Sequence, residues 1–342
     1  MAKHNQQSGK SVLQRPEKPT LKTISALSGL AVPTVSRALG DAPDISAATK
    51  EKVRRIAHEI GYVPNRAGVR LRTGRTNVVS LVLSTEADAL NLTSRLISAI
   101  AGGLRDTPYH LVVTPDFPDD DPLKPIKYIV ETGSADLIII NRIQPEDIRV
   151  RYLMDRGFPF VTHGRTVWAE QHAYYEYDNH AFGGLAVREM ARRGHRRILL
   201  IAPPRDQNYA AEMIAGGRAA AGETGIELIA AGGVSCDDHR DKVEAYVAEK
   251  LRRDKGITGI VSASPNATMA AVAGLEAAGR KVGEGFDVYS KETIPFLTLF
   301  RPGILCAQED VAKAGANLAR AALHALQNPD EPPMQFLDVP KE

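Results

Sequence analysis

The chain has 342 residues, 43% of them hydrophobic and 25% charged, which is the composition of a folded protein with room for two or three compact units. No run of about 18 apolar residues occurs, and the first residues lack the apolar core of a secretory signal. We therefore expect neither a membrane protein nor an exported one, but a cytoplasmic one. Two cysteines, Cys236 and Cys306, are too few for a disulfide framework or a cysteine-based zinc site.

The formal net charge of +2 conceals an uneven distribution. Residues 1–76 hold 14 Lys and Arg against 5 Asp and Glu, whereas residues 77–342 hold 29 against 36. A basic module of this kind can collect on a polyphosphate surface while an acidic body stays in solution. Basic tails are also common as plain solvated surface, so the charge indicates nucleic acid only together with a binding motif. Residues 1–19 are polar, and we expect them to form a disordered basic leader.

Two short helices with a glycine-containing turn between them follow the leader. Thr20 is placed as the N-cap of the first helix and Gly29 at its end, with apolar residues at helical spacing in between. Pro33 suits the first turn of the second helix, which ends at Gly40. Ser46 begins a third helix, which we expect to close a three-helix core. The first two helices predict a helix-turn-helix, in which the second helix enters the major groove of DNA.

In such a motif the residues at the start of the second helix face the base edges. Arg37 can donate a bidentate pair to guanine, Val32 and Pro33 can touch thymine methyl groups, and Thr34 and Ser36 can hold phosphates. The alternative is a plain helical hairpin with a surface arginine. Spacing alone does not separate the two interpretations.

Three strings carry a family resemblance: AVPTVSRAL at residues 31–39, EKVRRIAHEIGYVPNR at residues 51–66 and LRTGRTNVVSLVL at residues 71–83. They are similar to those of the lactose-repressor (LacI/GalR) family of bacterial transcription regulators, and the likeness continues in weaker form to the C-terminus. The resemblance implies a repressor that binds a pseudo-palindromic operator as a homodimer. It also implies a small-molecule effector, a sugar or a related metabolite, that controls DNA binding.

The same resemblance implies a hinge helix at residues 65–72 that folds when two subunits meet on an operator. Leu71 would be the apolar wedge that kinks the duplex from the minor groove. Gly68 stands where the family usually has alanine, which costs the helix about 1 kcal/mol, so we expect a hinge that depends strongly on dimerisation and DNA. Besides the groove-facing residues, the DNA contacts implied by the family are Thr20, Leu21, Asn65, Arg66, Gly68 and Leu71.

Beyond the linker, apolar strands alternate with helix-length segments. The predicted strands are 78–83, 109–114, 135–141, 158–164, 196–202, 225–231 and 257–264. This alternation predicts parallel, doubly wound sheets with helices on both faces, in two successive lobes. The resemblance implies the fold of periplasmic sugar-binding proteins, with the last helix (Val311–Gln327) in the first lobe and a strand at 334–340 in the second. The expected division is therefore a helix-turn-helix domain at 20–64, a hinge and linker at 65–76, and an α/β effector-binding and dimerisation core at 77–342. Within the core, lobe 1 is expected at about 77–175 plus 305–330, and lobe 2 at about 176–304 plus 331–342.

The effector site can be carried over from the family by position. The residues implied are Ser84, Glu86, Asn91, His163, Arg165, Asp178, Met213, Ser264, Asn266 and Glu292. Two positions depart from sugar-binding members, because Met213 replaces an arginine fork and Lys291 replaces an aspartate. Either Lys291 or Arg205 supplies the cation, or the effector is not a typical neutral sugar. Glu292 can still accept hydrogen bonds from hydroxyl groups.

The body lacks the common enzyme motifs: no phosphate-binding glycine loop, no dinucleotide fingerprint and no nucleophile elbow is present. The cluster from Cys236 to His239 is interpreted as a solvated turn rather than a metal site. We therefore expect no enzyme, no metal and no cofactor. The remaining rivals are a solute-binding protein, and a constitutive regulator whose effector site is degenerate.

Overall fold

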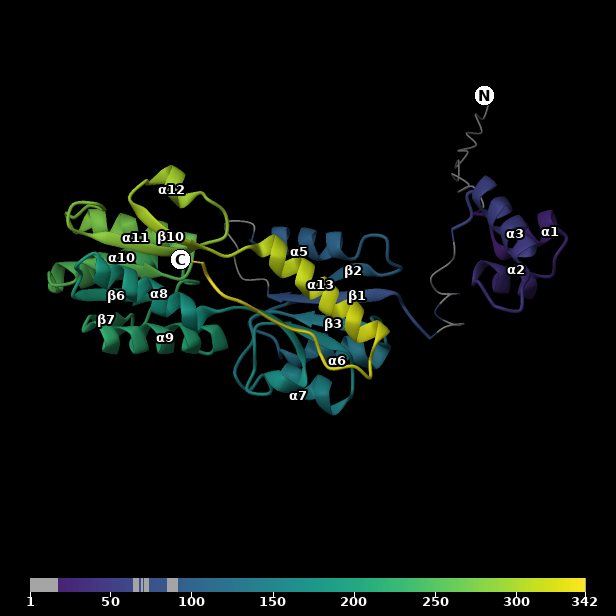
Figure 1. The fold of residues 1–342 in the computed structure, drawn as a ribbon, viewed down its shortest axis with the longest axis horizontal. Coiled ribbons are helices and arrows are strands. Elements are labelled where there is room, and N and C mark those ends of the chain that lie inside the picture. Colours follow the sequence, from purple (N-terminus) through teal and green to yellow (C-terminus); the bar gives the residue numbers. More distant parts are fainter. Residues whose placement is uncertain (1–17, 64–67, 69, 71–73, 85–91, 342) are drawn as a thin grey trace, which may run out of the picture. The chain divides into compact units, whose positions relative to one another are not determined.

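The structure is a computed structural model, and it describes residues 18–63, 68, 70, 74–84 and 92–341, except for the side chains of Leu92 and Phe300. The chain divides into two compact units, Met1–Thr76 and Asn77–Glu342 (Figure 1). Within the described part, no helix is long and apolar enough to cross a membrane.

The first unit is a three-helix domain, as predicted. It contains α1 (Leu21–Ser28), α2 (Val32–Leu39) and α3 (Ala47–Glu59). The side-chain oxygen of Thr20 accepts a hydrogen bond from the amide of Thr23, and the Thr23 hydroxyl oxygen accepts one from the amide of Thr20, so α1 begins with a capping box. Gly29 ends α1 in the left-handed region, at φ 71°. The helices share a small core formed by Ile24, Val35, Ala38, Val53, Ile56 and Ala57.

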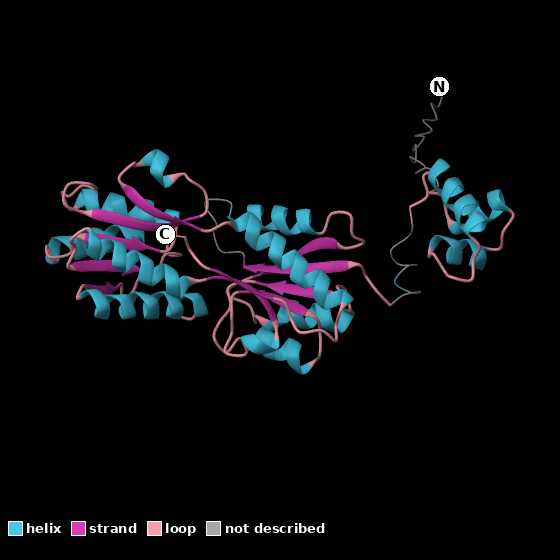
Figure 2. Ribbon diagram, viewed as in Figure 1, coloured by secondary structure: helices cyan, strands magenta, loops and turns pink. Residues whose placement is uncertain are grey.

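Lobe 1 of the second unit combines a sheet with covering helices (Figure 2). Its sheet is parallel and six-stranded, in the order β11-β5-β4-β3-β1-β2. Its strands are β1 (Val78–Ser84), β2 (His110–Asp116), β3 (Leu137–Ile140), β4 (Phe160–His163), β5 (Ala173–Tyr177) and β11 (Gln335–Asp338). One face packs against α5 (Leu92–Gly103) and α13 (Val311–Gln327), and the other against α6 (Leu123–Thr132) and α7 (Ile148–Asp155). A short 3-10 helix, η1 (Ala169–Gln171), precedes β5.

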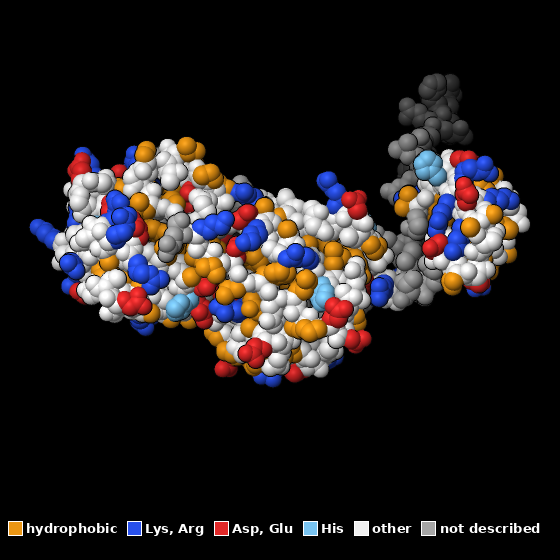
Figure 3. All heavy atoms as spheres, in the orientation of Figure 1, with side chains coloured by type: hydrophobic (Ala, Val, Ile, Leu, Met, Phe, Trp, Pro, Cys, Tyr) orange, Lys and Arg blue, Asp and Glu red, His pale blue; other side chains and the backbone are white. Residues whose placement is uncertain are grey.

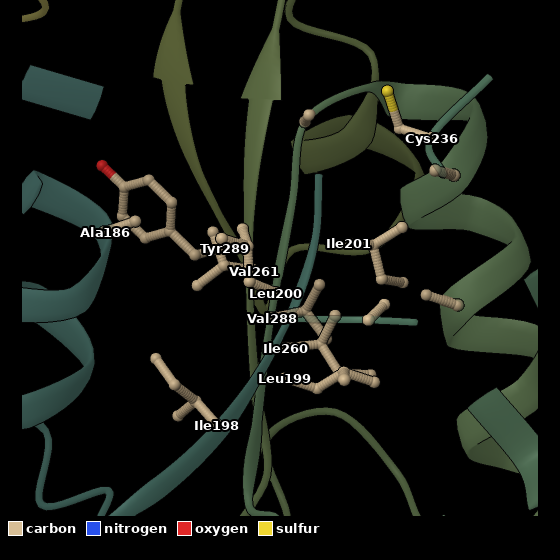
Figure 4. Packing of buried hydrophobic residues seen from close by; sticks show 14 of the residues in the cluster. Ala186, Ile198, Leu199, Leu200, Ile201, Cys236, Ile260, Val261, Val288 and Tyr289 are labelled. Atoms are coloured by element: carbon tan, nitrogen blue, oxygen red, sulfur yellow. The ribbon is translucent and has the colours of Figure 1, made fainter. Parts of the chain in front are cut away.

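Lobe 2 repeats this design with a five-stranded parallel sheet in the order β10-β9-β8-β6-β7. Its strands are β6 (Arg197–Ile201), β7 (Glu227–Ala230), β8 (Gly259–Ser262), β9 (Asp287–Glu292) and β10 (Ile304–Gln308). Its helices are α8 (Asn179–Arg192), α9 (Asn208–Thr224), α10 (Arg240–Arg253), α11 (Pro265–Ala277) and α12 (Leu297–Phe300). Figure 4 shows Ile198 and Tyr289 on the Ala186 side of this sheet, and Leu199 and Ile201 on the opposite side. Both faces are therefore buried, as is usual for parallel sheets.

Two glycines bring α8 and α9 into close contact. A Cβ atom built on Gly183 would meet the carbonyl oxygen of Met213, and one built on Gly216 would meet the carbonyl oxygen of His180, both well inside van der Waals contact. Since the obstacles are backbone atoms, no side-chain movement could relieve the clash. Only glycine permits this helix spacing.

The expected lobe boundaries at the C-terminal end are wrong in two places. β10 is hydrogen-bonded to β9 in lobe 2, and β11 is hydrogen-bonded to β5 in lobe 1, the reverse of the expected assignment. Lobe 1 thus contains residues 77–177 and 309–338, and lobe 2 contains residues 178–308. Strands β5, β9 and β10 are not among the predicted strands. Polar residues accompany the apolar ones in β5 and β9, and β10 offers only a short apolar run of Ile304–Ala307 before Gln308.

The entry of the chain into lobe 1 is firmly held at Asn77. Its backbone is left-handed, at φ 55°, and its amide donates to Oδ2 of Asp136 at 2.8 Å. Its carbonyl oxygen accepts from the amide of His110 at 2.9 Å, and that of Val78 accepts from the amide of Asp136 at 2.8 Å. The first residue of the unit is therefore tied to the segments on both sides of β1.

Candidate functional site

The outer face of α2 carries the predicted base readers. Val35 and Ala38 are buried in the three-helix core, so Pro33 and Arg37 lie on the exposed side of the helix. The Arg37 guanidinium forms an ion pair with Asp44, which lies in the loop between α2 and α3; their side chains are 57% and 47% exposed. Val32, Thr34 and Ser36 are partly buried. An exposed arginine on an otherwise small-residue helix face fits insertion into a major groove.

Most cations of α3 serve the domain itself. Lys50 and Arg54 both contact Asp41, at 3.2 Å and 2.6 Å, and the Lys52 ammonium donates to the carbonyl oxygen of Ser28 at 2.9 Å. Figure 3 shows basic and acidic side chains side by side on this unit. The third helix therefore holds the other two in place, as expected for a scaffold.

Only some of the remaining predicted DNA contacts lie among the described residues. Thr20 is exposed and occupied in the capping box, and Leu21 is partly buried. Gly68 is exposed and helical. Asn65, Arg66 and Leu71 lie outside the described residues, so their roles in the hinge stay predictions.

In the second unit, the carboxyl ends of the two sheets meet. Both sheets have the doubly wound order in which the second strand lies outside the first, and such sheets bind ligands beyond their carboxyl ends. Lys291 in β9 and Glu309, just after β10, form a largely buried ion pair, with 2.9 Å between Nζ and Oε2 and side chains 13% and 11% exposed. The Lys291 ammonium also donates to Oδ1 of Asn179 at 3.3 Å.

Two tyrosines and a histidine surround this pair. The Lys291 ammonium lies 5.3 Å from the ring centroid of Tyr177 and 5.9 Å from that of Tyr209. The Tyr177 hydroxyl is buried without a hydrogen-bond partner among the described residues. Burial lowers the pKa of His163 below 6.5, although the Glu309 carboxylate opposes this. This shift favours the neutral imidazole of His163 close to the charged pair.

A loop after β3 provides three further contacts to lobe 2. Arg142, at φ 54°, pairs with Asp237 across 2.8 Å, and the carbonyl oxygen of Ile143 accepts from the amide of Asn208 at 2.8 Å. The Gln144 side-chain amide donates to Asp206 at 3.2 Å. A non-glycine residue in the left-handed region is uncommon and here aims a side chain at the opposite lobe.

Arg165 makes a separate contact between the lobes. Its Nε donates to Oε2 of Glu176 at 2.5 Å, and its Nη2 lies 3.7 Å from Oε2 of Glu212 in α9. The second carboxylate oxygen of Glu176 is buried and has no hydrogen-bond partner within the described ranges. Burial raises the pKa of Glu176 above its usual value, even though Arg165 opposes the shift.

Several predicted effector residues are occupied by the fold itself. Met213 is fully buried in the core of lobe 2. The buried Glu292 carboxylate accepts from the amides of Phe296 and Leu297 and from Gln308. Asp178 and Ser264 accept the capping hydrogen bonds of α8 and α11. Their positions do not favour direct ligand contact by Met213 or Glu292 in this conformation.

The other predicted effector residues are placed as follows. Ser84 ends β1, and Asn266 is partly buried in the first turn of α11. Glu86 and Asn91 lie outside the described residues. The sequence reasoning missed Tyr177, Tyr209 and Glu309. The position of Tyr209 one helical turn before Met213 was the available signal, since a residue four earlier lies on the same face.

No cluster of three or more His, Cys, Asp or Glu suited to a metal ion occurs in the part of the chain that the structure describes. Both cysteine thiols are instead shielded, and burial raises the pKa of Cys306 to about 12.

Each of the two units matches a known protein family. Residues 20–65 match the family model "Bacterial regulatory proteins, lacI family", and residues 126–327, more than half of the chain, match "Periplasmic binding protein domain". The chain is 27% identical to the HTH-type transcriptional regulator CelR of Thermobifida fusca, over 95% of this chain and 97% of that protein. It is 26% identical to the regulator AglR of Rhizobium meliloti (strain 1021), over 93% and 90% respectively.

A solved structure described as a transcriptional regulator CelR-cellobiose complex aligns with a TM-score of 0.69 at 25% identity, covering 95% of this chain and 98% of that one. The helix-turn-helix unit, the two doubly wound lobes and these matches agree. The chain belongs to the lacI family of bacterial regulatory proteins: it is a sequence-specific DNA-binding transcriptional regulator with a periplasmic-binding-protein core.

Proposed function

We propose that this regulator is a homodimeric repressor that responds to a neutral saccharide bound between the two lobes. The observation that carries the proposal is the Lys291–Glu309 pair, which lies beside Tyr177 and Tyr209 where the strand ends of both lobes meet. Two-fold symmetry of the dimer then calls for a pseudo-palindromic operator. The effector would act by favouring one arrangement of the lobes, to which DNA affinity is linked.

The charge balance of the pair favours a neutral ligand. A lone buried lysine would select an anion, but Glu309 compensates the Lys291 charge at 2.9 Å. The pair together offers ammonium donors and a carboxylate acceptor, which are the groups that sugar hydroxyls need. The tyrosine rings add apolar faces for a sugar ring. Of the two alternatives left by Met213 and Lys291, this arrangement supports the one in which Lys291 supplies the cation and the ligand is neutral.

A ligand screen tests the effector. Cellobiose and other neutral disaccharides are compared with sugar phosphates and uronates by thermal shift and calorimetry. At about one hundred times its dissociation constant, a true ligand stabilises the protein by about 2.7 kcal/mol. Glu309→Gln should abolish the shift, whereas the surface variant Arg188→Ala should keep it. Binding of anionic sugars alone would contradict the proposal, and the absence of any shift would favour the constitutive regulator.

Turnover is measured in the same screen. We expect the ligand to be recovered unchanged, because the site offers a charge-paired lysine and a neutral histidine rather than an activated nucleophile. Product formation would support an enzyme instead.

The contact surface of the proposed homodimer lies on β2, an edge strand of lobe 1. Val112 and Val113 are each 44% exposed on it. Exposed apolar edge strands are normally covered, and a second copy of the chain would cover this one symmetrically. Sedimentation should give a dimer for the wild type and a monomer for Val113→Lys. A wild type that stays monomeric on its selected DNA would contradict the proposed homodimer.

Base reading by Arg37 is tested with DNA. The wild type selects its preferred site from a random duplex library, and Arg37→Ala is then compared on that site and on unrelated DNA. The loss on the selected site should be far larger; an equal loss on both would mean that Arg37 meets only phosphate.

In the hinge, Leu71→Ala should weaken binding and reduce DNA bending, which a gel assay of bend angle can measure.

A further inference from the structure

We propose that Asp44 positions Arg37 for base reading, so that a carboxylate outside the recognition helix sets selectivity at the base pair that Arg37 contacts. This inference rests on the proposed role of Arg37. It adds a residue of the α2–α3 loop to the determinants of operator sequence.

The loop holds Asp44 in a fixed place next to the end of α2. The amide of Ala42 donates to the carbonyl oxygen of Arg37 at 3.0 Å, and the amide of Ile45 donates to that of Ala42 at 3.2 Å. Ile45, directly after Asp44, packs against the three-helix core. Because backbone hydrogen bonds and an apolar anchor restrain the loop, its carboxylate is a stable partner rather than a mobile one.

The ion pair restrains Arg37 without exhausting its hydrogen-bond donors. A free arginine side chain carries about 2 kcal/mol of rotamer entropy, part of which is lost when it docks on a base. Pairing of one terminal nitrogen with Asp44 removes part of that freedom in advance. The guanidinium has five N–H donors in a fixed fork, so donors remain for the O6 and N7 atoms of guanine.

The two acidic residues of this loop have different partners. Asp41 is bound by Lys50 and Arg54, both on the scaffold helix α3. Asp44 pairs with the one arginine on the outer face of α2. Each carboxylate adds a negative charge to a surface that must approach phosphates, which lowers affinity for any DNA. The charge of Asp44 thus lowers general affinity, while it favours discrimination between bases through Arg37.

The test compares Asp44→Asn with Asp41→Asn in the full-length protein. Both variants remove one negative charge from the same loop. Affinities are measured for the site selected by the wild type, for versions in which each guanine is replaced in turn, and for unrelated DNA. Asp44→Asn should reduce the preference for guanine at one base pair about five- to twentyfold. Asp41→Asn should raise affinity for all DNAs alike and keep the base preference.

Repetition in the Arg37→Ala background separates positioning from direct contact. If Asp44 acts through Arg37, adding Asp44→Asn to Arg37→Ala changes no base preference further. Three results would overturn the proposal: equal effects of the two asparagine variants on base preference, an undiminished effect of Asp44→Asn without Arg37, or an effect at a base pair that Arg37→Ala leaves unchanged. A wild type that selects no sequence at all would instead overturn the proposed base reading. Melting curves of each variant confirm that the domain is folded.

Discussion

The DNA-binding unit and the two-lobed body use charged side chains in opposite ways. In the first unit the ion pairs lie on the surface, as with Arg37 and Asp44, whose side chains are 57% and 47% exposed. In the body, key pairs are largely or fully buried: the side chains of Lys291 and Glu309 are 13% and 11% exposed, and those of Arg149 and Asp147 are 7% and 2% exposed. Exposed pairs contribute little to stability and can exchange partners when DNA arrives. Buried pairs hold their side chains in one arrangement, and removal of one partner leaves the other charge buried and uncompensated.

Glycine packing in the body should give the largest effect of any single change. Gly216→Ala places a Cβ against the carbonyl oxygen of His180, so α8 and α9 must separate, and the body should lose about 3 kcal/mol or more. Gly222→Ala is the matched control on the same helix, because nothing lies within 4 Å of its Cβ position. The control should gain up to about 1 kcal/mol from helix propensity. Urea unfolding measures both, and similar values would show that the helix contact is loose.

Breaking the buried pair should come next. Lys291→Met leaves the Glu309 carboxylate buried without its cation and should cost about 3 kcal/mol in urea unfolding. The double variant Lys291→Met with Glu309→Gln should recover much of that loss, because no charge remains to be buried. If the double variant is as unstable as the single one, the loss in free energy of unfolding comes from altered packing and not from an unpaired charge.

The pH dependence of the two regions should have opposite signs. Burial raises the pKa of Glu176, so its ionisation costs the body stability, and the cost grows as pH rises above the ordinary 4.5. The melting temperature of Glu176→Gln, relative to wild type, should therefore rise between about pH 4 and about pH 7. In the first unit, hydrogen bonds from Lys50 and Arg54 lower the pKa of Asp41. The stability that ionised Asp41 gives to this unit is therefore lost as pH falls below 3.8. A relative melting temperature of Glu176→Gln that does not vary with pH would contradict the burial argument.

A surface pair of the DNA-binding unit should give the smallest effect. Arg55 and Glu59 lie one turn apart on α3, with 3.9 Å between Nε and Oε1 and side chains 70% and 62% exposed. Glu59→Gln should change stability by less than about 0.5 kcal/mol. A loss comparable to that of Lys291→Met would end the contrast between the two regions.

The same contrast explains what could be predicted from the sequence. The three helices of the first unit carry local signals, because Thr20 and Ser46 cap the helices that they precede and Gly29 ends one. The Lys291–Glu309 pair has no local signal, since it depends on parallel pairing between β9 and β10. Neither strand was predicted, and the lobe boundary near them was misplaced for the same reason. Tyr209 was missed because positional matching pointed to Met213, which the fold places in the core.

The clamp at Asn77 has a mechanical consequence. Hydrogen bonds tie this residue to Asp136 and His110, on the segments that lead into the two neighbours of β1. A tension applied to the chain before it would load β1 in shear against two parallel strands, so many hydrogen bonds would resist together. The first strand of lobe 1 is therefore held firmly in its sheet against a pull from residue 76.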